Sequence, residues 1–133
     1  MNSGPALVSI LRQGDILVAS VHTALDDSQM VRFQEDLVRQ IGAHRARGVI
    51  IDVAALDVID SFASRTLRAL SEMARLRGAV TVIVGIQPDV AMSMVRLGMG
   101  MGAVPTALDL EEGLGYLTEL RRVPRNQERP RRP

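Results

Sequence analysis

The sequence contains no cysteine, no tryptophan and no lysine, and only 2% of its 133 residues are aromatic. The absence of cysteine excludes disulfide bonds, thiol catalysis and cysteine-held zinc. The absence of lysine excludes the Gly-Lys-Ser/Thr sequence of P-loop proteins. Because aromatic rings are scarce, the chain has little material for stacking on nucleic-acid bases. Leu, Val, Ile, Ala and Met must therefore build the core.

Long hydrophobic runs are also missing. No stretch approaches the ~20 apolar residues of a membrane helix, and the first residues carry neither a basic region nor an apolar signal core. We therefore expect a cytoplasmic protein without a membrane partner. The hydrophobic fraction of 47% in 133 residues suits one domain with a single core.

Charge is distributed unevenly, although the net charge is only +1. Residues 121–133 hold six Arg and one Glu, whereas residues 1–120 hold ten Arg and fourteen acidic residues. We interpret residues 1–122 as one domain and residues 123–133, with three prolines, as a disordered Arg/Pro-rich tail. Because the tail lacks interleaved aromatics, we do not expect it to bind nucleic acid. Binding of the tail to anionic lipid stays a lesser alternative.

Hydrophobic periodicity divides the chain into alternating strands and helices. The predicted elements are a hairpin over 7–11 and 16–21, a helix over 27–47, a strand over 48–54, a helix from 61 to 78, a strand over 79–84, a helix from 88 to 98, a short strand over 104–108 and a helix from 109 to 120. Strands followed by helices imply right-handed crossovers and parallel pairing. The sequence therefore predicts an α/β fold, a mostly parallel sheet with an N-terminal antiparallel hairpin and about four helices packed against it.

Capping residues mark the predicted helix ends. Asp26 or Asp27 can cap the first long helix, and Gly48 can end it in a left-handed conformation. Ser61 opens the second helix as its N-cap. Asp109 begins the last helix, with the Glu three residues further on completing a capping box.

Candidate catalytic and metal-binding groups are few. His22 and His44 are the only potential bases, and no spacing ties either to a serine nucleophile, so we interpret both as surface histidines. Asp52, Asp57 and Asp60 could suggest a magnesium site, but the phosphate-binding groups that usually share such a site are missing. We predict no cofactor, no metal and no enzymatic activity. An α/β enzyme that uses these acids stays a lesser alternative.

The glycine-rich segment 98–102 follows a helix, whereas the dinucleotide-binding motif lies between a strand and a helix. We therefore interpret it as a connection. The preceding helix is predicted to be lined by Val90, Met94 and Leu97 and to end at Gly98. Four methionines in this part of the chain could form an adaptable surface for a partner, with half of them expected in the core, namely Met92, Met94, Met99 and Met101.

The segment most typical of a regulatory site lies where Asp60-Ser61 opens the second helix. A hydroxyl there is accessible, and a phosphate on it would meet the positive end of the helix dipole. Because Asp57 and Asp60 already make the patch acidic, about −2 of added charge would repel a partner docked on neutral Ser61. Spacing alone leaves open that Ser61 is only a helix cap.

This segment carries a resemblance to a known family. It reads Ile51-Asp52-Val53-Ala54-Ala55-Leu56-Asp57-Val58-Ile59-Asp60-Ser61-Phe62 and continues Ala63-Ser64-Arg65. In this strand-loop-helix context it resembles the STAS family of anti-sigma-factor antagonists, and it is most similar to the RsbS-type members of bacterial stressosomes. The resemblance covers about residues 5 to 120 and includes Gly85-Ile86-Gln87-Pro88 and the helix end at Leu97-Gly98.

The resemblance implies a phosphorylation-switched regulator in a stress response. Unphosphorylated, such a protein holds an RsbT-like serine kinase together with RsbR-like STAS proteins in homo- and hetero-oligomers. Phosphorylation of Ser61 by the kinase releases it, and an RsbX-like phosphatase resets the system. The implied partner-binding residues are Asp57, Asp60, Ser61, Phe62 and Ser64.

An alternative within the same fold is a SpoIIAA-like antagonist that binds an anti-sigma kinase directly as a small complex. Co-assembly with RsbR-type proteins separates the two possibilities. The sequence also leaves open whether Ser64 or Thr66 is phosphorylated.

Overall fold

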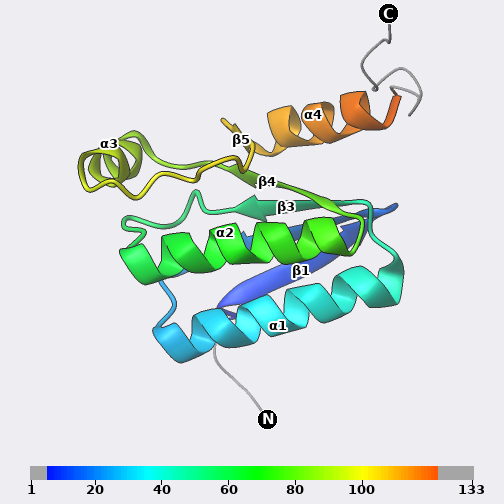
Figure 1. The fold of residues 1–133 in the computed structure, drawn as a ribbon, viewed down its shortest axis with the longest axis horizontal. Helices are drawn as coiled ribbons and strands as arrows, with labels where there is room; N and C mark the ends of the chain where they lie inside the picture. Colours follow the sequence, from blue (N-terminus) through cyan, green and yellow to red (C-terminus); the bar gives the residue numbers. More distant parts are fainter. Residues whose placement is uncertain (1–5, 123–133) are drawn as a thin grey trace, which may run out of the picture.

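The structure is a computed structural model that describes residues 6–122. Its elements are β1 (Val8–Gln13), β2 (Ile16–Val21), α1 (Asp27–His44), β3 (Gly48–Asp52), α2 (Ser61–Leu76), β4 (Val80–Val84), α3 (Pro88–Arg96), β5 (Thr106–Ala107) and α4 (Leu110–Arg122) (Figure 1). The order and type of the predicted elements are confirmed. The predicted tail, residues 123–133, lies outside the described residues.

The five strands form one sheet in the order β1-β2-β3-β4-β5. β1 runs antiparallel to β2, as the predicted hairpin requires, and the other neighbouring pairs are parallel. The carboxyl ends of β2 to β5 therefore meet at one end of the sheet. α1, α2 and α3 all begin at this carboxyl end, because each follows one of the parallel strands.

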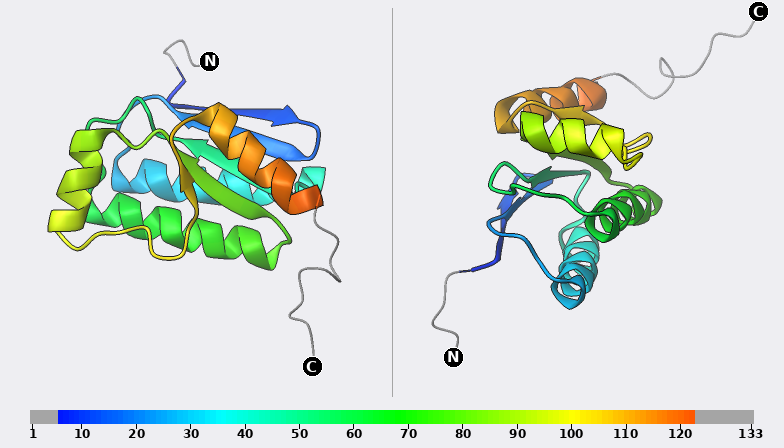
Figure 2. Two further views of the ribbon diagram at one scale, coloured as in Figure 1. Left: turned by 90° about the horizontal axis from the view of Figure 1, so that it is seen from above. Right: turned by 90° about the vertical axis from the view of Figure 1, so that its left-hand side faces the viewer.

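Helices cover the sheet on both faces (Figure 2). The main core lies under α1 and α2 and includes the fully buried Leu37, Ile51 and Leu70. A second, smaller core joins Ile50 to Leu117 of α4 on the opposite face. β3 and β4 are consequently buried on both sides, as their continuous apolar sequences predicted.

The end of α1 differs from the prediction. The helix stops at His44, and Arg45 caps it in a left-handed conformation with φ of 51°. Gly48, which was expected at the left-handed position, is instead the first residue of β3 and pairs with Ile16. Leu117 Cδ1 would lie 2.9 Å from a Cβ at Gly48. Arg45 therefore takes the left-handed position that ends the helix, and Gly48 serves as a close-packed strand residue.

The region after β4 also departs from the prediction in detail. β5 is only two residues long, Thr106–Ala107. Segment 98–102 is the predicted connection. α3 ends at Arg96, so Leu97 follows the helix, and the chain turns at Gly98, where φ is +71°. The Leu97 side chain is 70% exposed.

Helix α4 begins with a variant of the predicted capping box. Asp109 Oδ1 accepts a hydrogen bond from the Glu112 N–H at 2.9 Å, as predicted. The Glu112 carboxylate, however, accepts the N–H of Leu108 at 2.6 Å and not that of Asp109. The box therefore ties the helix to the residue that follows β5.

Candidate phosphorylation and partner-binding site

The loop between β3 and α2 is fixed by polar and apolar contacts. The Asp52 carboxylate accepts a hydrogen bond from the Ala54 N–H at 2.9 Å, and the Gln87 side chain donates to the Ala54 carbonyl at 2.7 Å. Leu56 and Ile59 are buried in the main core. Because both its backbone and its apolar side chains are held, this loop presents the start of α2 in a defined position.

Asp60, and not Ser61, is the N-cap of α2. Its Oδ1 accepts a hydrogen bond from the Ala63 N–H at 2.8 Å. The prediction that Ser61 caps the helix was therefore wrong. Asp and Ser are equally good N-caps, so two adjacent candidates leave the choice to the backbone path that the buried loop residues impose.

Ser61 is the first residue of α2, and its side chain is exposed. Within residues 6–122 its hydroxyl forms no hydrogen bond, since the cap bond belongs to Asp60. Phosphorylation of this hydroxyl would therefore break no hydrogen bond within residues 6–122. Such a group is better suited to phosphorylation than a hydroxyl that caps the helix.

The neighbouring predicted site residues divide between surface and core. Asp57 is exposed beside Ser61, and Phe62 is half-buried against the main core. Ser64 is only 1% exposed and donates its hydroxyl to the Ser61 carbonyl at 3.4 Å. Thr66 is also buried. The structure therefore places the Ser64 hydroxyl inside the domain and not on the predicted partner-binding surface.

A groove of about 530 Å³ opens beside Ser61. We call it the Ser61 groove; one wall is the loop before α2 and the other is α3. It is lined by Asp57, Val58, Ile59, Asp60, Ser61, Val90, Ser93, Leu97 and Met99. Met99, one of the four methionines predicted to form an adaptable partner surface, lines the groove, whereas the sequence did not indicate that α3 lies beside Ser61.

Carboxylates make the edge of the Ser61 groove acidic. Asp57 and Asp60 are exposed on the loop wall. Asp89, exposed in the first turn of α3, precedes the lining residue Val90 but is not itself part of the lining. The N-terminus of α2 adds a partial positive charge at Ser61 itself. A phosphate on Ser61 would consequently be tolerated by the helix and would add to the negative charge of the surrounding surface.

The histidines lie apart from Ser61. His22 shares a hydrogen bond with the Ser9 hydroxyl at 2.8 Å, and His44 lies 3.2 Å from the Arg12 guanidinium. Both are exposed, as predicted, and neither lines the Ser61 groove. Among residues 6–122, no three His, Asp or Glu side chains are grouped to hold a metal ion.

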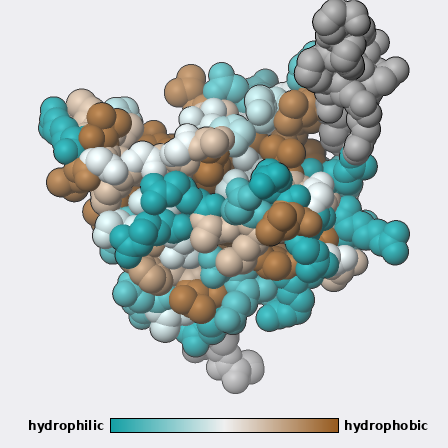
Figure 3. Space-filling model, in the orientation of Figure 1, coloured by the Kyte–Doolittle hydropathy of each residue, from teal (hydrophilic) through white to brown (hydrophobic). Residues whose placement is uncertain are grey.

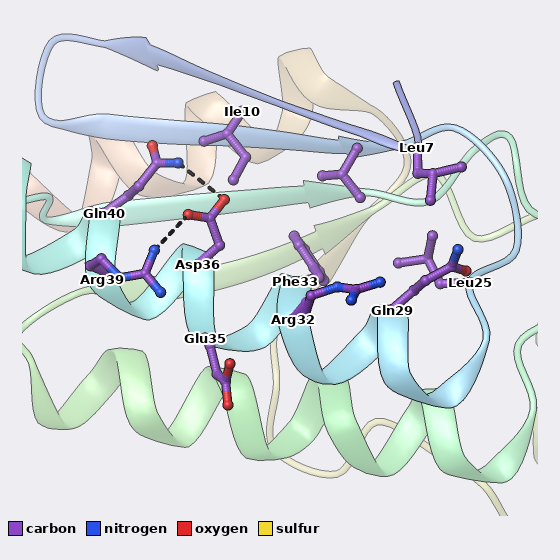
Figure 4. Close-up of a pocket in the computed structure, with 11 residues that line it drawn as sticks. Leu7, Ile10, Leu25, Gln29, Arg32, Phe33, Glu35, Asp36, Arg39 and Gln40 are labelled. Atoms are coloured by element: carbon purple, nitrogen blue, oxygen red, sulfur yellow. Dashed lines mark hydrogen bonds and ion pairs between the residues drawn. The ribbon is translucent and has the colours of Figure 1, made fainter. Parts of the chain in front are cut away.

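A second groove, of about 560 Å³, lies between β1 and α1 (Figure 4). Its apolar side chains include Ile10 and Phe33, while Asp36 on its polar side accepts hydrogen bonds from Arg39 and Gln40. No serine, threonine or histidine lines it. This groove therefore offers no phosphoacceptor, and the Ser61 groove is the better candidate site.

The fold and the Ser61 segment agree with a known family. The chain belongs to the STAS domain family, whose model matches residues 8–112. The chain is 29% identical over 106 residues to the RsbT co-antagonist protein RsbRA of Bacillus subtilis, which covers 80% of this chain and 39% of that protein. It thus spans well under half of that relative's length.

Solved structures give a second comparison. A serine-to-glutamate variant of RsbS from Moorella thermoacetica matches with a TM-score of 0.76 and 36% identity, over 88% of this chain and 99% of that one. A chain from the stressosome, described as a signal integration and transduction hub, matches with a TM-score of 0.69 and 33% identity, over 86% and 99%. Among residues 6–122, none of the helices combines the length and hydrophobicity that crossing a bilayer requires.

Proposed function

We propose that this protein is an RsbS-like STAS regulator that sequesters an RsbT-like serine kinase and releases it when Ser61 is phosphorylated. The observation that carries the proposal is the exposed Ser61 hydroxyl. Within residues 6–122 it does not cap the helix, and it lines a groove together with the carboxylates of Asp57 and Asp60. The similarity to RsbS and to a co-antagonist of RsbT supports it.

The physical basis of the switch is local. A phosphate adds about −2 of charge at pH 7. At Ser61 it would stand beside Asp57 and Asp60, which already line the groove. A partner that buries the neutral hydroxyl would then have to desolvate a dianion among carboxylates, which costs several kcal/mol unless cations pair with it. Binding is lost without unfolding of the domain.

The same similarities support the wider assembly. A stressosome chain shares the fold at 33% identity, and the RsbR relatives share a domain of this size. We therefore place this protein in homo- and hetero-oligomers with RsbR-like STAS proteins, with an RsbX-like phosphatase restoring Ser61. Co-elution with an RsbR-like protein in a large assembly is expected. A small binary complex with an anti-sigma kinase would indicate the SpoIIAA-like alternative.

The test of the phosphoacceptor is phosphosite mapping. The protein is incubated with an RsbT-like kinase and ATP, and modified peptides are identified by mass spectrometry. Ser61→Ala is expected to abolish the phosphate. Ser93→Ala is the matched control, because Ser93 is also exposed and lines the same groove; it is expected to leave modification unchanged. Undiminished phosphorylation of Ser61→Ala would overturn the assignment.

A further inference from the structure

Helix α3 is apolar around most of its circumference, although much of it is exposed. Val90 and Met94 face the main core, as a surface helix requires. Met92 and Val95 lie elsewhere on the helix and are 47% and 76% exposed, and Leu97, just after it, is 70% exposed. Asp89, Ser93 and Arg96 form the polar side of α3. The domain buries only the side of α3 that carries Val90 and Met94 and leaves its other apolar side chains exposed.

The exposed side chains of α3 are joined by one from the Ser61 loop. Val58 is 60% exposed and lines the Ser61 groove, as Leu97 does from the α3 side. Hydrophobic residues gather at the end of the molecule formed by α3 (Figure 3). Single exposed apolar residues are ordinary on protein surfaces, whereas Val58 and Leu97 share one groove, which Met92 and Val95 do not line.

We infer that the Ser61 groove is the apolar anchor site of the kinase, receiving a hydrophobic side chain of that partner between Val58 and Leu97. This inference rests on the proposed function, since it says which contacts give the complex with the kinase its affinity. The phosphoacceptor Ser61 and the apolar anchor site are then separate parts of one surface. Phosphorylation of Ser61 releases the kinase, and apolar contacts in the groove bind it.

Geometry argues for the kinase as occupant. A standard protein interface covers roughly 800 Å² of each partner, which corresponds to a patch roughly 16 Å in radius. Ser61 itself lines the groove. An enzyme that brings a phosphoryl group to Ser61 Oγ therefore covers the groove as well.

Electrostatics argue that the groove supplies the affinity. The phosphates of the nucleotide carried by a kinase would approach Asp57, Asp60 and Asp89, all exposed at or next to the groove. Like charges oppose that approach, so the nucleotide itself supplies no attraction. The Val58 and Leu97 walls offer apolar contact, and the acidic edge attracts basic side chains that flank the anchor.

The anchor also explains why one phosphate can release the partner. A hydrophobic side chain of the kinase that binds in the groove excludes water from the groove residues around Ser61. A phosphate on Ser61 would have to lose its hydration there, with Asp57 and Asp60 as its neighbours. The apolar contact and the phosphate therefore exclude each other.

The experiment compares two leucines of equal chemistry. Leu97→Gln removes the anchor wall, and Leu76→Gln is the matched control, because Leu76 is 75% exposed at the far end of α2. Val58→Gln tests the opposite wall. Titration of each full-length variant with the RsbT-like kinase is expected to show about 10-fold weaker binding for Leu97→Gln and Val58→Gln and less than about twofold change for Leu76→Gln. Unfolding midpoints confirm that each variant is folded.

The outcomes separate this inference from the proposed function. If the kinase binds and phosphorylates the unaltered protein, but Leu97→Gln and Val58→Gln bind like Leu76→Gln, the anchor is wrong and the Ser61 switch stands. If the kinase ignores the unaltered protein, both fail. If sedimentation without kinase shows self-association that Leu97→Gln alone disrupts, a second copy occupies the groove and the anchor is again wrong.

Discussion

The two ends of the sheet carry opposite charges for the same physical reason. At the carboxyl end, Asp26 and Asp60 cap the beginnings of α1 and α2. At the amino end, these helices terminate at Arg45 and Arg77. Carboxylates at helix N-termini and guanidinium groups at C-termini both complement the helix dipole. Capping alone therefore accounts for the charges at these helix ends.

The carboxyl end of the sheet also carries exposed apolar side chains, which helix capping does not explain. Val58 and Leu97 are exposed there beside Ser61, and both line the Ser61 groove. Neither is a polar cap, and neither contributes to a core of the described domain. The charges of the helix caps therefore do not by themselves indicate a binding site. The exposed apolar side chains next to the Ser61 hydroxyl distinguish the proposed binding end from the other end of the sheet.

The largest effect is expected from a comparison of two serines within the first turn of α2. Ser64→Asp places a carboxylate where the side chain is 1% exposed, and unfolding should become easier by about 3 kcal/mol or more. Ser61→Asp lies on the surface at a helix N-terminus and should change stability by less than about 0.5 kcal/mol. Urea unfolding measures both. Equal losses would show that Ser61 is not on a tolerant surface.

The second-largest effect is expected from loss of the α2 N-cap at the carboxyl end of the sheet. Asp60→Ala removes the hydrogen bond accepted from the Ala63 N–H and should cost about 1 kcal/mol. Asp57→Ala is the control, because Asp57 is exposed on the same loop and caps no helix; its effect should stay within about 0.5 kcal/mol. The assignment of Asp60 as cap fails if the two variants unfold at the same urea concentration.

Glycine substitutions at the two helix C-caps of the amino end should change the stability of the protein in opposite directions. Arg45 has a φ of 51°, which favours glycine, so Arg45→Gly should stabilise the protein by about 0.5 kcal/mol. Arg77 has a φ of −97°, so Arg77→Gly should destabilise it by about 0.5 to 1 kcal/mol. Thermal unfolding at neutral pH compares them. A loss of stability in Arg45→Gly would mean that the arginine side chain itself holds this end together.

The smallest effect concerns acid pH. Hydrogen bonds from the Gln29 N–H and the Ser28 hydroxyl lower the pKa of Asp26 below its ordinary value of 3.8. A lowered folded-state pKa contributes stability that is fully present above the unfolded-state value and is lost as the pH falls through the folded-state value. Asn also caps helices. The stability difference between the native protein and Asp26→Asn should therefore shrink below about pH 4, and a constant difference down to pH 2 would contradict it.

Much of the fold could be predicted, because it depends on local pattern. The apolar runs of β3 and β4 and the helical spacing of Met30, Phe33 and Leu37 indicated their elements directly. Choices settled by tertiary packing could not be predicted. The sequence alone does not distinguish Asp60 from Ser61 as the N-cap of α2. The backbone path of the loop, whose apolar residues are buried, determines which of the two caps the helix.

The candidate site was predictable only in part. The Ser61 segment is evident from the residues themselves, whereas the helical spacing of Val90, Met94 and Leu97 does not reveal that Val90 and Met94 are buried while Leu97 is 70% exposed. Methionine positions followed the expected division, with Met94 and Met101 buried and Met92 exposed. The groove depends on two segments distant in sequence, which periodicity does not bring together.

The measurement that tests the central claim most directly is calorimetric titration of the RsbT-like kinase with the unmodified protein and with the same protein phosphorylated stoichiometrically at Ser61. The account predicts tight binding of the unmodified form and at least about 10-fold weaker binding of the phosphorylated form, with both forms equally folded. Equal affinity for the two forms would contradict the switch and leave Ser61 as an ordinary surface residue of α2.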